Sequence, residues 1–120
     1  MKTKLLGRWG EQMAADYLKS KGYEILGMNY AVKAGEIDVI AAQGDQLAFV
    51  EVKLRKNADF ARACESITPA KRAKLKKAAQ LWLESRSEEY YARFDVIEIY
   101  APEGAKTRSP QINHIEQAFW

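Results

Sequence analysis

The sequence is poor in the residues that cross-link, interrupt or anchor a chain. Its 120 residues contain one cysteine, three prolines, seven glycines and one histidine. A lone Cys64 can form neither an internal disulfide nor a zinc-ligand set, which is typical of an intracellular protein. No apolar run approaches the roughly 20 residues of a membrane-spanning helix, and Met1 to Gly10 has no signal-peptide pattern. We therefore expect a cytoplasmic protein that does not contact membranes.

What is present is the composition of a small globular domain. Hydrophobic residues make up 48% of the chain and charged residues 29%. No repeat or Pro/Gly/Ser-rich linker divides it, so we expect a single domain over 1–120. The net charge is only +3, but Thr68 to Gln80 contains five cations and no acid. This uneven placement indicates a polyanionic partner more strongly than the net charge does.

Hydrophobic spacing and turn signals predict two helices and several strands. Apolar residues at helical spacing end at Gly22, and Thr68 with Pro69 is a strong start signal for a second helix. The segment from Lys56 to Ile67 has no clear period. The expected elements are a helix over about 4–21, strands over 23–30, 36–41 and 47–53, a helix over 68–85, and strands over 94–100 and 112–119. This order predicts a three-layer α/β domain whose central mixed sheet is flanked by the helices.

Gly44 and Asp45 predict a two-residue hairpin turn, which sets the pairing of the strands on either side. The predicted pairs, outward from the turn, are Gln43 with Gln46, Ile40 with Phe49, Val39 with Val50, Asp38 with Glu51, Ile37 with Val52, and Glu36 with Lys53. Paired residues, and residues two apart, share a face of the sheet. One face should therefore carry Glu36, Asp38, Glu51 and Lys53, and the other a packed layer of Ile37, Val39, Val50 and Val52.

The opposition of Asp38 and Glu51 is the strongest functional signal. Like charges directly across a ladder destabilise it, so we expect a cation there, and Mg²⁺ or Mn²⁺ suits two carboxylates with further contacts from water and phosphate oxygens. Lys53 should point at the same spot, where it would act on the attacking water and offset charge during phosphodiester hydrolysis. The Val52 carbonyl is a further candidate ligand. The alternative is a solvated face with a salt bridge from Glu36 to Lys53.

Residues outside the hairpin are candidates for supporting roles. Glu11 lies at the edge of the inward face of the first helix and is a candidate third acid, with an exposed or helix-capping acid as the alternative. Glu36 and Arg55 are candidate supporting residues for the site. The residues expected to serve packing or ties between strands are Trp9, Phe60, Trp82, Arg93, Asp95, His114 and Trp120.

The second helix places Lys71, Arg72 and Lys74 in its first two turns, where cations oppose the helix dipole. Phosphate contacts would explain this placement, because neutralising a phosphate releases counterions and the helix N-terminus already favours an anion. These three residues and Lys77 are therefore the expected nucleic-acid-binding set. The alternative is an ordinary solvated helix surface.

Several of these positions resemble a known family. Asp38 followed by Glu51-Val52-Lys53 is similar to the PD-(D/E)xK nuclease motif. The longer phrases GEIDVIA over 35–41 and FVEVK over 49–53 resemble the bacterial YraN family of predicted endonucleases, which are distantly similar to archaeal Holliday-junction resolvases. Other matching positions are Gly10-Glu11, Lys71 and Arg93-Phe94-Asp95. One departure is Ile37, which stands where the motif has proline.

The resemblance implies a restriction-endonuclease-like fold and a specific set of roles. Asp38 and Glu51 would bind the metal, Lys53 would be the catalytic lysine, and Glu11 would be an accessory acid. It implies metal-dependent hydrolysis of DNA, with branched or single-stranded DNA in repair or recombination as the substrate. Two alternatives stay open, a catalytically inactive DNA-binding or scaffold module and a purely structural interaction protein. A homodimer is expected by analogy, because one subunit of 120 residues has little surface for gripping a duplex.

Overall fold

The computed structural model describes residues 2–56 and 67–119. The elements are α1 (Lys2–Ser20), β1 (Glu24–Val32), β2 (Gly35–Gln43), β3 (Gln46–Arg55), α2 (Pro69–Glu84), β4 (Tyr91–Tyr100), the short 3₁₀ helix η2 (Gly104–Lys106) and β5 (Gln111–Phe119). The order of helices and strands is the predicted one, although β4 begins three residues earlier than expected. The expectations for Phe60, Cys64 and Trp120 lie outside the described residues.

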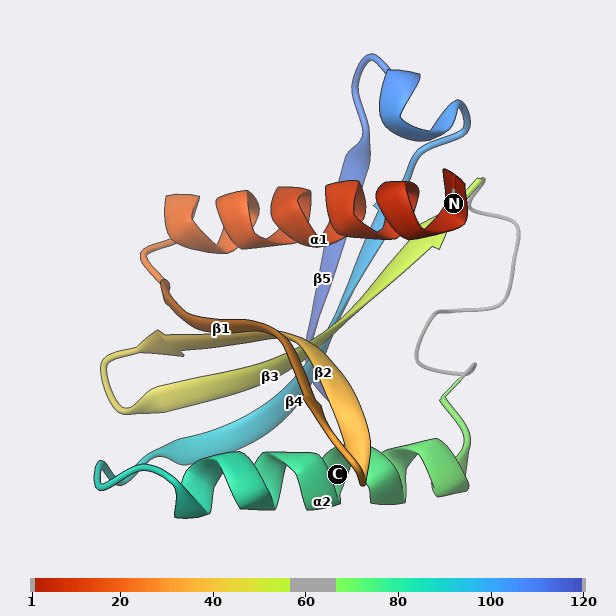
Figure 1. Ribbon diagram of the computed structural model, residues 1–120. Helices are drawn as coiled ribbons and strands as arrows, with labels where there is room; N and C mark the ends of the chain where they lie inside the picture. The colour runs from red at the N-terminus through yellow and green to blue at the C-terminus, as the bar shows by residue number, and fades with distance from the viewer. Residues whose placement is uncertain (1, 57–66, 120) are drawn as a thin grey trace.

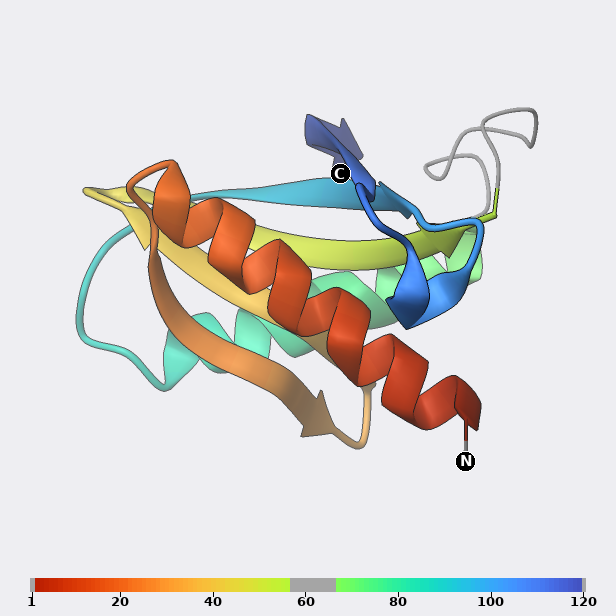
Figure 2. The ribbon, with the colours of Figure 1, turned by 90° about the horizontal axis from the view of Figure 1, so that it is seen from above.

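The five strands form one mixed sheet in the order β1-β2-β3-β4-β5. Strands β3 and β4 run parallel, and the other neighbours run antiparallel. A parallel pair needs a crossover connection, and α2 supplies it. Helix α1 covers one face of the sheet and α2 the other (Figures 1 and 2). The predicted three-layer architecture is confirmed.

The helices begin and end where the local signals predict. The Thr68 side chain accepts a hydrogen bond from the Lys71 amide at 3.1 Å, and Pro69 is the first helical residue of α2. At the end of α1, Gly22 has a φ of 93°, and the Tyr23 amide donates to the Leu18 carbonyl at 3.0 Å. No helix in the described part of the chain is long and apolar enough to cross a membrane.

Each face of the sheet buries its own hydrophobic cluster. On the side of α2, the Phe49 ring packs edge-on against Trp82, with ring centroids 5.9 Å apart. The residues that α2 buries are the predicted Leu75, Ala78, Ala79 and Trp82. On the side of α1, the cluster includes Ala14, Leu18, Val39, Val50, Ile97 and Ile99. The sheet is therefore buried on both faces, and these two clusters fix the positions of α1 and α2 on the sheet.

The hairpin of β2 and β3 confirms the predicted register only in part. The ladder runs from Gln43 opposite Gln46 to Val39 opposite Val50. Beyond Val39 the predicted pairing was wrong, because the Val52 amide donates instead to the Asp38 side chain, at 2.9 Å to Oδ2. Glu36 with Lys53 and Ile37 with Val52 are likewise not ladder pairs.

The predicted apolar layer was also wrong at one position, Ile37. This side chain packs in the cluster under α2, whereas Val39 packs under α1. The irregularity coincides with one in the neighbouring strand β1, where Asn29 adopts a left-handed φ of 53° between Met28 and Tyr30, the partners of Val39 and Ile37. This conformation interrupts the alternation of faces, and the ends of β1 and β2 curl toward α2 (Figure 1).

Candidate functional site

A hollow of about 490 Å³ opens where the end of the β2–β3 hairpin meets the start of α2. Its polar lining consists of Glu36, Asp38, Glu51, Thr68, Lys71 and Lys74. The β1–β2 turn closes one side, because Gly35 lies directly against the backbone of Lys74. A Cβ atom at Gly35 would lie only 3.1 Å from the Lys74 carbonyl oxygen. The absence of a side chain at this position lets the hairpin dock closely on α2.

The two predicted metal-binding carboxyl groups meet in this hollow. Glu51 is only 6% exposed, and its side chain is hydrogen bonded to that of Asp38. Burial first, and the neighbouring Asp38 second, raise the pKa of Glu51 to about 8, against the opposing effect of Lys71 and Lys53. Without a cation, Glu51 therefore keeps its proton at neutral pH.

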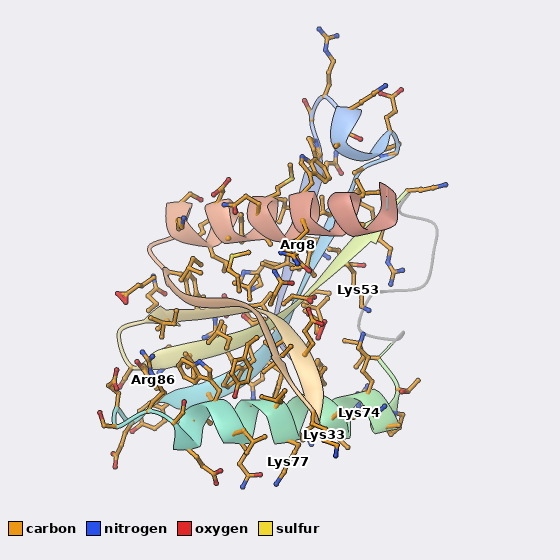
Figure 3. The ribbon with its side chains drawn as sticks, in the orientation of Figure 1. Arg8, Lys33, Lys53, Lys74, Lys77 and Arg86 are labelled. Carbon is orange, nitrogen blue, oxygen red and sulfur yellow. The ribbon has the colours of Figure 1, made fainter. Side chains whose placement is uncertain are left out.

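Lys53 lies beside these carboxyl groups, as predicted. Its side chain is half-buried, and Figure 3 shows it between the levels of the two helices. Burial lowers the pKa of Lys53, and Lys71 lowers it further through a direct side-chain contact and its charge. Glu51 and Asp38 act in the opposite direction. The structure thus brings together two carboxyl groups and two amines from β2, β3 and α2.

Glu11 approaches the same group of acids from α1. Burial raises its pKa, and so do the charges of Asp38 and Glu36, whereas a hydrogen bond from the Asn29 side chain lowers it. Its Oε1 atom is buried and has no hydrogen-bond partner among the described residues. Glu11 lines a second hollow of about 450 Å³, together with Arg8, Asn29 and Glu36. Glu36 borders both hollows, and its side chain is exposed.

The donor set fits a hard divalent cation better than zinc. Among residues 2–56 and 67–119, no group of three or more His, Cys, Asp or Glu side chains is arranged to hold a metal ion. Structural and catalytic zinc sites use three or four such ligands, whereas Mg²⁺ is bound through one or two carboxylates and keeps several waters. Two carboxyl groups that meet in one hollow, with the buried Oε1 of Glu11 nearby, match the second pattern.

The predicted nucleic-acid-binding residues do not all lie at this site. Lys71 and Lys74 line the hollow, and Figure 3 shows Lys74, Lys77 and Lys33 gathered along α2. Arg72 is held elsewhere, because its Nε donates to the Ile67 carbonyl at 3.1 Å and its guanidinium lies 5.6 Å from the centre of the Phe119 ring. Arg55 lines a separate hollow with Leu6, Leu54, Lys56, Ala101, Pro102 and Gly104.

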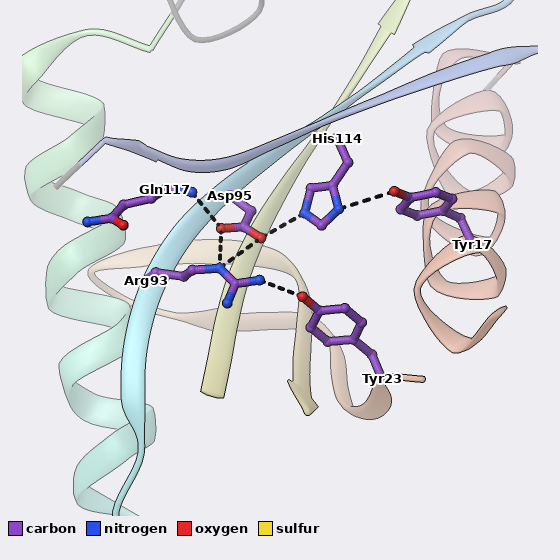
Figure 4. A network of polar contacts seen from close by, with 6 residues as sticks. All are labelled: Tyr17, Tyr23, Arg93, Asp95, His114 and Gln117. Carbon is purple, nitrogen blue, oxygen red and sulfur yellow. Dashed lines mark hydrogen bonds and ion pairs between the residues drawn. The ribbon is translucent and has the colours of Figure 1, made fainter. Parts of the chain in front are cut away.

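A second polar cluster ties β4 to β5 on the far side of the sheet (Figure 4). The fully buried Asp95 accepts hydrogen bonds from Arg93 Nε at 3.0 Å and the Gln117 amide at 3.0 Å, and pairs with His114 Nε2 at 2.7 Å. Burial alone would raise the pKa of Asp95, but the bonds from His114, Arg93 and Gln117 lower it. The geometry supports the expectation that Arg93, Asp95 and His114 are structural.

Sequence reasoning missed two members of the site. Lys71 was expected at the DNA surface, but the structure places it beside Lys53 and Glu51. Its half-burial depends on how α2 docks, which helical periodicity does not encode. Asn29 had no signal at all in the sequence, because the left-handed conformation that turns its strand is a property of the folded sheet.

A five-stranded mixed sheet between two helices, with its polar site at the splayed end of a central hairpin, defines an α/β protein with a three-layer, restriction-endonuclease-like fold. The chain belongs to the family described as "Uncharacterised protein family UPF0102", whose model matches residues 10–99. The expected YraN-type family membership is thus supported, and the matched segment contains every residue of the hollow.

Relatives from several bacteria are similar to this chain along nearly their whole length. The chain is 43% identical to a UPF0102 protein of Syntrophomonas wolfei over 115 residues, which cover 95% of this chain and 96% of the relative. It is 44% identical to one of Geotalea daltonii over 118 residues, covering 98% and 91%. A UPF0102 protein of Clostridioides difficile is 43% identical over 120 residues, covering 99% and 100%.

Proposed function

We propose that this protein is a metal-dependent endonuclease that hydrolyses phosphodiester bonds in DNA. The observation that carries the proposal is the contact between the buried Glu51 and Asp38 in a hollow that Lys71 also lines, with Lys53 as a charged neighbour of both acids. Burying two acids together costs stability, so a fold selected for stability alone would avoid the arrangement. A divalent cation removes that cost by neutralising both carboxylates.

The acids of the hollow and their neighbours on β3 have distinct roles in this proposal. Asp38 and Glu51 would hold Mg²⁺ or Mn²⁺, and the Val52 carbonyl is a further candidate ligand. When bound, such a cation supplies Lewis-acid polarisation of the phosphate and makes water more acidic. The Val52 amide fixes the orientation of Asp38, because it donates to Oδ2 at 2.9 Å. Lys53 would orient the attacking water and stabilise negative charge as it develops on the phosphate oxygens.

The charge around the hollow supports a nucleic-acid substrate. Lys74 and Lys77 are exposed on α2, on the side where Figure 3 shows them with Lys33. Exposed lysines that gather on one side of a phosphodiester-hydrolysis site suit the backbone of a polyanion. Branched or single-stranded DNA is the substrate that the family resemblance favours.

Cleavage of linear, flapped and four-way DNA substrates with Mg²⁺ or Mn²⁺ tests the proposal. We expect the wild-type protein to cut at least one of them, and Asp38→Ala and Lys53→Ala to lower the rate by about 100-fold or more. The matched control is Lys76→Ala, because this lysine is exposed on α2 and does not line the hollow. Equal residual activity in wild type and Lys53→Ala would identify a contaminant and contradict the proposal.

A DNA-binding or scaffold role would give a different pattern. In that case the protein would bind the DNA panel with a strong salt dependence and cut none of its members, and Asp38→Ala would leave the affinity unchanged. Salt-insensitive, negligible DNA binding would instead favour a purely structural interaction protein.

A further inference from the structure

The end of the sheet away from the β2–β3 turn carries a further hollow, of about 400 Å³. It lies where β3 and β4 end and where the connection from β4 to β5 forms η2 beyond the sheet (Figure 1). The residues that line this Tyr100 hollow are Lys56, Tyr100, Pro102, Thr107, Arg108, Ser109 and Gln111. None of them has a role in the proposed reaction. A hollow of this volume is within the range of sites that bind small organic groups.

The floor of the Tyr100 hollow lies on the same face of the sheet as Glu51. Side chains alternate between the two faces along a strand. Val50 on β3 and Ile99 on β4 pack in the cluster under α1. Glu51 and Tyr100, each one residue further along its strand, therefore face the side of α2. Gln111 lies directly opposite Tyr100 in the β4–β5 ladder and shares this face.

A strand of nucleic acid in the hollow of Asp38 and Glu51 is within reach of the Tyr100 hollow. From Glu51 to Arg55, the partner of Tyr100 on β3, the strand rises about 13 Å. A few nucleotides of an extended single strand span such a distance. Lys53 lies between Glu51 and Arg55 and faces the same side. The two hollows therefore lie along one track on one face of the sheet.

The lining of the Tyr100 hollow combines an aromatic ring with cations and hydrogen-bonding groups. Tyr100 is half-buried, and Lys56 and Arg108 are exposed. Of the residues that the structure describes, no acid lines this hollow. Bases stack on aromatic rings with little dependence on sequence, and cations beside the ring bind the backbone phosphates. The Gln111 amide can both donate and accept hydrogen bonds at the edge of a base.

The loop that forms the wall of the Tyr100 hollow is fixed by its own hydrogen bonds. The Ala101 amide donates to the Arg55 carbonyl at 2.7 Å, which joins the start of the loop to β3. The Gly104 amide donates to the Ala101 carbonyl and the Thr107 amide to the Gly104 carbonyl, both at 3.0 Å. The Glu103 amide donates to the Thr107 hydroxyl at 3.0 Å. A wall that is ordered before binding lowers the entropy lost when a ligand is held.

We propose that the Tyr100 hollow binds one unpaired nucleotide of the strand that is cut in the hollow of Asp38 and Glu51. The base stacks on the Tyr100 ring, and Lys56 and Arg108 contact the adjoining phosphates. The inference rests on the proposed nuclease function for the identity of the strand as DNA. A base that is paired in a duplex is not available for this contact, so the site selects single-stranded or branched substrates.

Binding of a labelled single-stranded oligonucleotide to the metal-free protein, measured by fluorescence anisotropy, tests this site without any reaction. Tyr100→Leu should raise the Kd by about 10-fold, because it removes the stacking surface. Tyr100→Phe keeps the ring and should bind as wild type does. The matched control is Tyr91→Leu, since Tyr91 at the start of β4 is 70% exposed and does not line the hollow. The proposal is overturned if Tyr100→Leu binds as tightly as wild type, or if Tyr100→Phe binds as weakly as Tyr100→Leu.

Changing the ligand gives a second readout that leaves the protein unaltered, so it applies even if Tyr100→Leu does not fold. Wild type should bind an oligonucleotide of abasic residues about 10-fold more weakly than the normal strand. Tyr100→Leu should lose most of this preference, and it should bind a duplex of the same length as wild type does. Arg108→Gln should lower the salt slope for the single strand by about one. Equal affinity of the wild type for normal and abasic strands would contradict the inference.

Cleavage kinetics with Mg²⁺ separate this inference from the nuclease proposal. For a single-stranded or flapped substrate, Tyr100→Leu should raise KM by about 10-fold and leave kcat nearly unchanged, because Tyr100 does not touch the reacting atoms. A protein that prefers normal to abasic strands but cuts no DNA would support the nucleotide site and contradict the nuclease. A protein that cuts DNA with the same KM in wild type and Tyr100→Leu would do the opposite.

Discussion

Glu51 is the residue of the site whose charged form is most strongly disfavoured by its surroundings. Its pKa of about 8 lies far above the ordinary value of 4.5, first because it is buried and second because Asp38 is beside it. An acid of this kind binds its proton more tightly in the folded than in the unfolded chain. Its contribution to stability is therefore complete below about pH 4.5 and is lost as the pH rises through about 8.

We predict that the free energy of unfolding of the metal-free protein falls by up to about 1.4 kcal/mol per pH unit across this window. Urea denaturation at a series of pH values between 4.5 and 8 measures it. Glu51→Gln is the control, because it keeps the size of the side chain and cannot ionise. Its stability should vary much less with pH and should exceed that of wild type at pH 8. The same pH slope in both proteins would show that Glu51 is not the group responsible.

At the scale of elements, the β2–β3 hairpin shows how far the sequence is informative. The turn at Gly44 and Asp45 predicts the ladder correctly as far as Val39 opposite Val50. The rule of alternating faces fails around Asp38, because Ile37 and Val39, two residues apart, pack on opposite faces of the sheet. Asn29 in β1 lies opposite Asp38 and has a positive φ. No periodic pattern in the sequence predicts such a conformation. The contact between the two carboxyl groups is nevertheless the one predicted.

The left-handed conformation of Asn29 predicts how the stability of the protein responds to substitution at this position. Both Asn29→Gly and Asn29→Val lose the side-chain contact with Glu11, but glycine adopts a φ of 53° without strain, so Asn29→Val should be less stable than Asn29→Gly by about 1–3 kcal/mol. Urea denaturation of the two variants measures the difference. Ala31→Val is the matched control in the same strand, and valine should be tolerated there because β-branched residues favour extended backbone. If Asn29→Val is as stable as wild type, the left-handed conformation does not shape the site.

At the scale of the whole molecule, the site depends on the order of the layers. The parallel pairing of β3 and β4 requires a crossover, and the crossover helix α2 delivers Lys71 to the face where β2 and β3 carry Asp38 and Glu51. The charged residues of the hairpin are close in sequence and could be predicted from one turn. The place of Lys71 depends on packing between elements distant in sequence, which the pattern of single elements does not specify.

The central claim is that Asp38 and Glu51 hold a divalent cation, and calorimetric titration with Mn²⁺ at pH 7 tests it most directly. Because Glu51, with a pKa of about 8, holds its proton at this pH, binding should release about one proton, measured as the dependence of the heat on the ionisation enthalpy of the buffer. Asp38→Ala should lose both the binding and the proton release. Wild-type protein that binds no Mn²⁺, or an Asp38→Ala protein that binds it equally well, would contradict the account.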